Sequence, residues 1–214
     1  MNRSLQQRRE KERQARYEAI LDAAETMFFS KGYDKTTMDD IARTAKLSRA
    51  LLYVYFRDKA AIQCGIMLRA GDAMRDQFRA AMANADTGLK QLQALGDAYY
   101  RFSCEQSDYF HTLTQAHGAP LDVDEVWLQR LDSAEAQTMT LMCQAIEQGV
   151  EDGSLDRARI ADPLQTAYYL RGALHGVMML CQAPQHPACN HTKVDAAPLI
   201  TYTLNMLMLS MAAQ

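Results

Sequence analysis

The sequence predicts an all-α protein of about nine helices, and three observations support this fold class. Ten Gly and five Pro in 214 residues make about 7%, against roughly 12% in average proteins, so few positions break regular structure. The first proline is Pro120, which leaves more than half of the chain without the strongest helix breaker. Apolar residues recur at steps of three and four, the period of an amphipathic helix. The hydrophobic fraction of 48% and the charged fraction of 23% exclude a chain that is disordered throughout.

Capping residues and glycines set the expected ends of these helices. Gly32 ends the first helix, because glycine accepts the left-handed conformation that follows many helices. Thr37 stands three residues before a carboxylate and begins the second helix as a capping box, and Ser48 caps the third. Asp162, followed by Pro163, begins the penultimate helix. The expected helices cover residues 17–31, 38–45, 49–56, 59–85, 89–105, 108–118, 124–148, 163–182 and 196–212.

The last two expected helices, 163–182 and 196–212, are apolar on nearly every side. A helix of this kind is buried, and in a chain of this size a second copy is the simplest partner. The sequence therefore predicts a homodimer through these two helices, with Leu204 and Leu207 in the interface.

The formal net charge of −3 hides an uneven distribution of charge. Residues 1–60 carry 13 Lys and Arg against 9 Asp and Glu, a net charge of +4, whereas residues 61–214 carry 10 against 17, a net charge of −7. A basic arm joined to an acidic body is typical of a chain whose one end meets a phosphate backbone. A solvated terminal helix of mixed charge is the alternative interpretation.

Residues 38–57 have the spacing of a helix-turn-helix, in which two helices cross around a three-residue turn. Small Ala42 lies at the point where the second helix crosses the first. An arginine on the second helix can bind guanine or phosphate, and a tyrosine hydroxyl can bind phosphate. Thr37 and Lys59 begin helices, whose free N–H groups favour a phosphate. The residues expected to face a major groove are Ser48, Arg49, Ala50, Tyr53 and Val54.

Three runs in this region, TTMDDIAR at 36–43, SRALLYVYF at 48–56 and RDK at 57–59, resemble the DNA-binding domain of the TetR family of transcriptional regulators. The resemblance covers residues 15–65. It implies a DNA-binding domain with a basic N-terminal arm at 1–60 and a larger helical domain for ligand binding and dimerisation at 61–214. By position, the residues that it assigns to phosphates are Thr37, Ser48, Tyr53, Tyr55 and Lys59, and those that it assigns to bases are Arg49 and its neighbour Ala50. Tyr55 is equally well explained as a core residue.

The chain departs from the family pattern at Lys46, where the family usually has glycine in the turn. A left-handed backbone at this position costs a residue with a side chain about 1 kcal/mol. Lys46 adds, in exchange, a positive charge that we expect to contact a phosphate of the operator.

The resemblance further implies that the larger domain binds a small molecule, which sets the distance between the two recognition helices of the dimer. The candidate lining consists of aromatic residues, methionines and one histidine. For each of them alone, an ordinary core position is the simpler interpretation. The expected lining residues are Tyr99, Phe102, Phe110, Trp127, Met139, Met142, Tyr168 and His175.

The function predicted from the sequence is that of a ligand-responsive transcriptional repressor. It binds palindromic double-stranded operator DNA as a homodimer and is released by a small, largely apolar effector. We expect no cofactor and assign no metal site.

A metal-sensing or redox-sensing regulator is the alternative function. Cys181, His186, Cys189 and His191 bring four potential zinc or copper ligands within eleven residues, although their spacing is not that of a standard zinc finger. Cys104 or Cys143 would be the oxidant sensor.

A helical enzyme is a further alternative, but the sequence has no glycine-rich phosphate loop, paired carboxylates or nucleophile elbow. The chain has no apolar signal segment near its start, no apolar run of membrane-spanning length and an odd number of cysteines. We therefore expect a cytoplasmic protein without a membrane segment.

Overall fold

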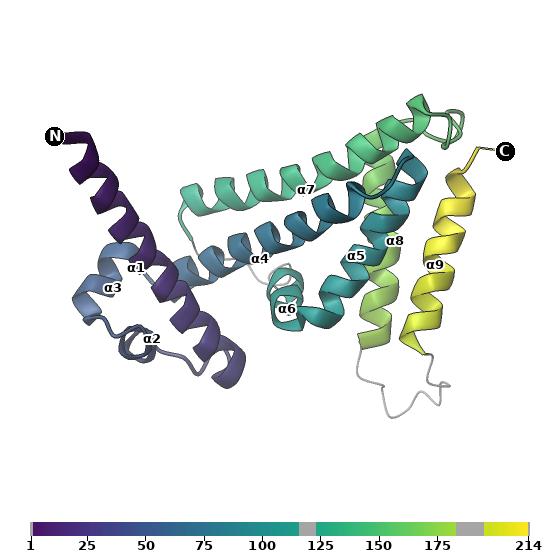
Figure 1. Cartoon of the computed structure of the whole chain (residues 1–214). Helices are drawn as coiled ribbons and strands as arrows, with labels where there is room; N and C mark the ends of the chain where they lie inside the picture. The colour runs from purple at the N-terminus through teal and green to yellow at the C-terminus, as the bar shows by residue number, and fades with distance from the viewer. Residues whose placement is uncertain (1, 116–122, 183–194, 214) are drawn as a thin grey trace, which may run out of the picture. The chain divides into compact units, whose positions relative to one another are not determined.

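The computed structural model describes residues 2–115, 123–182 and 195–213, and these residues form nine α-helices and no strand (Figure 1). The only extended pairing among them is an isolated bridge between Leu155 and Ala212. The predicted all-α class is confirmed. The chain divides into two compact units, Met1–Ala70 with His111–Asp132, and Gly71–Phe110 with Ser133–Gln214.

The first unit contains α1 (Asn2–Lys31), α2 (Met38–Thr44), α3 (Arg49–Tyr55) and the first half of α4 (Lys59–Met82). It also contains the end of α6 (Ser107–Gln115) and the start of α7 (Glu125–Glu151). α1 is longer than the predicted helix 17–31, because the polar and charged residues before Tyr17 continue the helix without burying a face. Its second half supplies the buried side. The fully or almost fully buried side chains of this unit include Ile20, Ala24, Ile41, Leu52, Phe56, Ile62 and Ile66.

The predicted helix caps are present at α2 and α3. The Thr37 side chain accepts a hydrogen bond from the Asp40 backbone N–H, and the Asp40 side chain accepts one from the Thr37 backbone N–H, which completes the capping box. Ser48 accepts from the N–H of Leu51 at the start of α3. Gly32 ends α1 with φ +88°, the left-handed conformation expected there.

The turn between α2 and α3 contains the one non-glycine residue with positive φ in the described part of the chain, Lys46 at +57°. The departure from glycine at this position thus leaves the left-handed backbone in place, and it is occupied by a residue that disfavours it. The turn is held by hydrogen bonds from the N–H of Lys46 to the carbonyl of Arg43 and from the N–H of Leu47 to that of Ala42.

Replacing Lys46 by glycine is expected to stabilise the protein. The variant Lys46→Gly should be about 1 kcal/mol more stable than Lys46→Ala, because both lack the charge and only alanine retains the steric cost of a left-handed backbone. Urea unfolding followed by circular dichroism measures the difference. A glycine variant less stable than the alanine variant would contradict the left-handed assignment.

The second unit is built from α5 (Gly88–Glu105), α8 (Pro163–Gln182), α9 (Ala196–Met211) and parts of α4, α6 (Ser107–Gln115) and α7 (Glu125–Glu151). α8 and α9 run side by side, and α5 packs against α9 (Figure 1). The principal buried side chains are Phe102, Phe110, Ile146, Leu155, Leu170, Leu174, Met178, Ile200 and Leu204.

The predicted end of α7 at residue 148 is wrong by about one turn. Gly149 is buried inside the helix, which continues to Glu151, and the left-handed glycine is Gly153, at φ +77°. Gly149 serves instead as a packing position, because the backbone of Gly88 lies directly against it.

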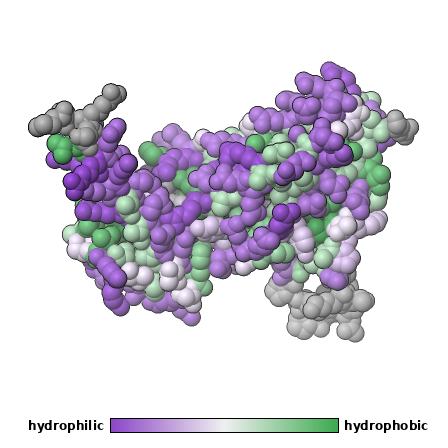
Figure 2. Space-filling view, in the orientation of Figure 1, coloured by the Kyte–Doolittle hydropathy of each residue, from purple (hydrophilic) through white to green (hydrophobic). Residues whose placement is uncertain are grey.

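The prediction that Leu204 and Leu207 lie in an interface between two copies is also wrong. Both are buried in the core of the protomer, with 3% and 7% of their surface exposed. The apolar residues that α8 and α9 leave exposed are Leu164, Tyr168, Tyr169, Leu180, Tyr202, Met206 and Leu209. Figure 2 shows hydrophobic residues at the surface in this part of the molecule.

Candidate nucleic-acid interface and effector site

One side of α3 is buried and the other is open to solvent. Leu52 and Phe56 have no more than 1% of their surface exposed, whereas Tyr53 has 42% and Val54 has 76%. Arg49 and Ala50 are exposed on the first turn. The structure thus places Ser48, Arg49, Ala50 and Tyr53 together on one accessible side of a capped helix, as the sequence predicted, while Tyr55 is half-buried.

Arg49 is held in place by partners that a nucleic acid could replace. Its Nη1 lies 3.2 Å from Oδ2 of Asp39, and its guanidinium carbon lies 5.6 Å from the centroid of the Tyr53 ring. A hydrogen bond with Tyr53 and the charge of Asp39 raise the pKa of Arg49, which stays cationic. Because the ion pair with Asp39 is exposed, it contributes little to stability. The guanidinium is therefore available to a phosphate or a guanine edge.

Thr37 is more constrained than the sequence suggested. Its hydroxyl donates to Oδ2 of Asp40 at 2.8 Å, and that oxygen also accepts from Nζ of Lys31 at 2.6 Å. The hydrogen bonds from Lys31 and Thr37 hold the pKa of Asp40 well below its usual range. The carboxylate is ionised at neutral pH, so the junction of α1 and α2 loses this contribution only when strong acid protonates Asp40. The hydroxyl proton of Thr37 belongs to this network.

Lys59 has a positioning role in the structure. Its ammonium donates to the carbonyl oxygens of Tyr33 at 2.7 Å and Thr36 at 3.0 Å, and lies 3.5 Å from that of Asp34. It also sits 4.2 Å from the centroid of the Tyr33 ring. The three protons of the ammonium are directed at the loop between α1 and α2. Lys59 thereby fixes this loop against α4. The position of Lys59 at the start of a helix had suggested a phosphate contact and gave no sign of this role.

Trp127, predicted to line the effector site, belongs to the first unit. Its ring stacks on Phe56 with a centroid distance of 6.2 Å, and Phe56 stacks on Tyr17 at 5.0 Å. The guanidinium of Arg130 lies 4.5 Å from the centroid of Trp127. The spacing of apolar residues over 124–148 is the same along the whole helix. It therefore could not show that Trp127 packs in the first unit and Met139 in the second.

Within the second unit, three of the predicted lining residues meet in an aromatic cluster. The hydroxyl of Tyr99 is 2.8 Å from Nδ1 of His175, and the Phe110 ring lies 5.5 Å from Tyr99 and 6.2 Å from His175. Burial raises the pKa of Tyr99 to about 12, so its hydroxyl remains protonated at neutral pH. Phe102 is fully buried core. The cluster therefore offers one polar pair in aromatic surroundings.

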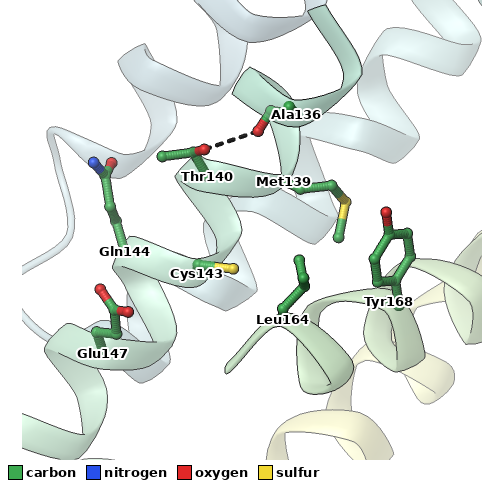
Figure 3. Close-up of a pocket in the computed structure, with 8 residues that line it drawn as sticks. All are labelled: Ala136, Met139, Thr140, Cys143, Gln144, Glu147, Leu164 and Tyr168. Carbon is green, nitrogen blue, oxygen red and sulfur yellow. Dashed lines mark hydrogen bonds between the residues drawn. The ribbon is translucent and has the colours of Figure 1, made fainter. Parts of the chain in front are cut away.

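A groove of about 450 Å³ lies between α7 and α8 of the second unit (Figure 3). Met139 and Tyr168, two further predicted lining residues, belong to it, whereas Met142 is not among the residues that line it. The ion pair of Arg171 with Glu135 is adjacent, since Arg171 also contacts the sulfur of Met139 at 3.5 Å. The complete lining is Ala136, Met139, Thr140, Cys143, Gln144, Glu147, Leu164 and Tyr168.

The metal and redox alternatives gain no support. His186, Cys189 and His191 lie outside the described residues, and within residues 2–115, 123–182 and 195–213 no group of three or more His, Cys, Asp or Glu is arranged to hold a metal. Burial is the main factor that raises the pKa of the Cys143 thiol, which disfavours the reactive thiolate. None of the described helices combines the length and the hydrophobicity needed to cross a membrane.

Comparison with known proteins identifies similarity in two parts. Residues 20–62 match the family model for bacterial regulatory proteins of the tetR family. The biofilm operon icaADBC negative transcriptional regulator IcaR of Staphylococcus aureus is 49% identical over 43 residues, which are 20% of this chain and 23% of IcaR. The chain therefore matches about a quarter of the length of this curated relative.

Solved structures extend the similarity to the whole fold. The fatty acid degradation regulator FadR of Bacillus halodurans has a TM-score of 0.65 at 19% identity, with 90% of this chain and 94% of that chain covered. AibR, solved in complex with isovaleryl coenzyme A and operator DNA, has a TM-score of 0.62 at 20% identity, with 90% and 98% covered. At these identities the likeness establishes the arrangement of helices and no more. The family-model match at residues 20–62 covers the segment from the second half of α1 to the start of α4, which includes the exposed α3.

Proposed function

We propose that the chain is a ligand-responsive transcriptional repressor of the TetR family of bacterial regulatory proteins, whose family model residues 20–62 match. It binds a palindromic operator as a homodimer and is released by a small, largely apolar effector. The family comprises regulators, so the alternative of a helical enzyme is set aside.

The observation that carries this proposal is the exposed side of α3. Arg49, Ala50 and Tyr53 stand together on a short helix whose start is capped and whose opposite side is fixed by Leu52 and Phe56. Such a preorganised helix can enter a major groove without reordering. We assign base contacts to Arg49 and Ala50, and phosphate contacts to Lys46, Ser48 and Tyr53. We assign to Lys59 the role of holding the α1–α2 loop in place, because its ammonium donates hydrogen bonds to carbonyl oxygens of that loop.

A second copy is the proposed partner of the exposed apolar side of α8 and α9. On α9, Tyr202, Met206 and Leu209 follow one another at steps of four and three and are 62%, 48% and 67% exposed. On α8, Gly172 and Gly176 have open space beside them, which leaves room for the close approach of another helix. In a two-fold symmetric dimer the same residues cover one another. Such a dimer would present two α3 helices to successive half-sites, about 34 Å apart.

The effector region is proposed in the second unit, around the Tyr99–His175 pair. Aromatic residues surround one protonated hydroxyl and one imidazole, which suits an apolar molecule with a single polar group. Two structural neighbours suggest which class of compound to test first. FadR is named for fatty acid degradation, and AibR was solved with isovaleryl coenzyme A. Both support an acyl compound as the effector.

Selection of random duplex DNA by the purified protein tests the proposed function. At about 150 mM salt non-specific binding is weak, and we expect an inverted repeat to be enriched. Fatty acids of increasing chain length, which are apolar chains with one polar group, and the corresponding acyl coenzyme A thioesters are then added to the complex. Release of the duplex is expected for at least one of them. Failure of folded protein to enrich any sequence would contradict the proposal.

Tyr53→Ala is expected to weaken binding to the selected duplex by at least about 10-fold, the effect of removing one specific interaction with DNA. The fold should remain intact, because the Tyr53 ring is exposed. Fluorescence anisotropy measures the affinity and thermal unfolding measures the stability. The matched control is Val126→Ala, an exposed apolar residue of the same unit outside α3. Unchanged affinity, or loss of the fold, would show that Tyr53 does not face DNA.

A further inference from the structure

A basic helical extension precedes the packed part of the DNA-binding unit. α1 begins at Asn2, and every residue from 5 to 16 is exposed. The family match starts only at residue 20, so the extension lies outside the matched module. At 1.5 Å per residue, residues 2–16 form a rod about 22 Å long. In Figure 1 this part of α1 continues beyond α3, and where Figure 2 colours its surface it is mainly hydrophilic.

The charges of this extension are largely unused within the protomer. Residues 8–16 contain five Lys or Arg and two Glu. Arg8 is paired with Glu12 at 3.0 Å. In contrast, Arg9, Arg13 and Arg16 form no ion pair with any residue of the described chain. Three guanidinium groups thus form no ion pair on the part of α1, residues 5–16, in which every residue is exposed.

The helical period aligns these three arginines with the inner side of the unit. Arg9, Arg13 and Arg16 follow steps of four and three, and a further step of four reaches Ile20, which is completely buried. The opposite side of α1 carries Glu18, and this residue binds Arg69 of α4. These three arginines, the arginine stripe, therefore continue the side of α1 that carries the buried Ile20, and they lie away from the side on which Glu18 binds α4. α1 packs against α2.

This placement determines what the arginine stripe meets when α3 occupies a major groove. Every residue from 5 to 16 is exposed, so no packed side chain covers this part of α1 in the protomer and its charges are accessible to a duplex bound by α3. We propose that Arg9, Arg13 and Arg16 bind the phosphate backbone flanking the bases read by α3, and so lengthen each half-site. This inference rests on the proposed DNA-binding function. Guanidinium groups suit the role because they bind phosphate oxygens in a bidentate way.

The test combines a charge variant with two lengths of DNA. The full-length variant Arg9→Gln/Arg13→Gln/Arg16→Gln keeps good helix formers and removes the three charges. Binding to the selected duplex is measured by fluorescence anisotropy over a range of salt concentrations. One duplex carries flanks of about 8 base pairs, which at about 3.4 Å per base pair are longer than the rod, and the other is trimmed to the inverted repeat. On the long duplex the salt slope should fall by about one for each phosphate that is no longer neutralised, and the affinity by at least about 10-fold. On the trimmed duplex wild type and variant should differ little.

The matched control Arg79→Gln/Arg101→Gln/Arg157→Gln removes three exposed charges from the second unit and should leave the salt slope unchanged. Normal binding by wild type, with the same slope for the arginine-stripe variant on the long duplex, would overturn the inference and leave the proposed function standing. An equal loss of affinity on both duplexes would also overturn it, because the arginines would then bind within the inverted repeat. If wild type binds no duplex, the proposed function and this inference fail together.

Discussion

Gly88→Ala should destabilise the protein by at least about 3 kcal/mol, the upper range for overpacking a core. A Cβ at this position would overlap the backbone nitrogen and Cα of Gly149 and the carbonyl oxygen of Ala145. These are backbone atoms of α7, so no side-chain rotation relieves the overlap and α5 must move away from α7. That movement would break the hydrogen bond from the N–H of Gly88 to Asp152, which has a length of 2.8 Å.

Gly96→Ala is the matched control for this effect because it changes a buried glycine of the same helix. Its new methyl group would meet the side chain of Leu204 rather than a backbone. Since the end of a leucine can rotate, we expect a smaller loss of stability. Thermal and urea unfolding at one fixed protomer concentration give both values. Wild-type stability of Gly88→Ala would refute the close contact between α5 and α7.

Met206→Glu/Leu209→Glu should dissociate the proposed homodimer. Both side chains are exposed in the protomer and neighbour each other on α9, so the variant folds as a protomer with charges on its apolar side. In a two-fold symmetric dimer four carboxylates would be buried close together without partners. We expect the dissociation constant of the dimer to rise at least about 100-fold, which corresponds to about 2.7 kcal/mol. Operator affinity should fall with it, because a protomer reads only one half-site.

Sedimentation velocity over a range of concentrations measures the dissociation. Val126→Glu adds a charge at an exposed apolar residue of the first unit and should leave the sedimentation coefficient unchanged. Leu204→Ala truncates a buried residue of α9 and should lower the melting temperature of the protein while leaving the exposed side of the helix intact. A wild-type sedimentation profile for the double glutamate variant would exclude this side of α9 as the interface.

The sequence by itself determined those features that depend on near neighbours in the chain. The capping box at Thr37 and the cap at Ser48 follow from hydrogen bonds that span three residues. The positive φ of Gly32 follows from its position directly after the end of a helix. The exposed side of α3 follows from a helical period with Leu52 and Phe56 as its buried positions. Each of these is a local constraint, which a short window of sequence contains.

Only the tertiary structure decided which of several equivalent candidates meets which partner. Trp127 packs on Phe56 rather than near Tyr99, and the ammonium of Lys59 binds loop carbonyls 23 to 26 residues away. On α9, which is apolar on all sides, Leu204 and Leu207 are core while Met206 and Leu209 are exposed. The physical reason is that such a helix has no polar side to fix its rotation. Its inner side is set by the crossing with α5 and α8, where Gly96 admits Leu204, and these contacts join residues far apart in the chain.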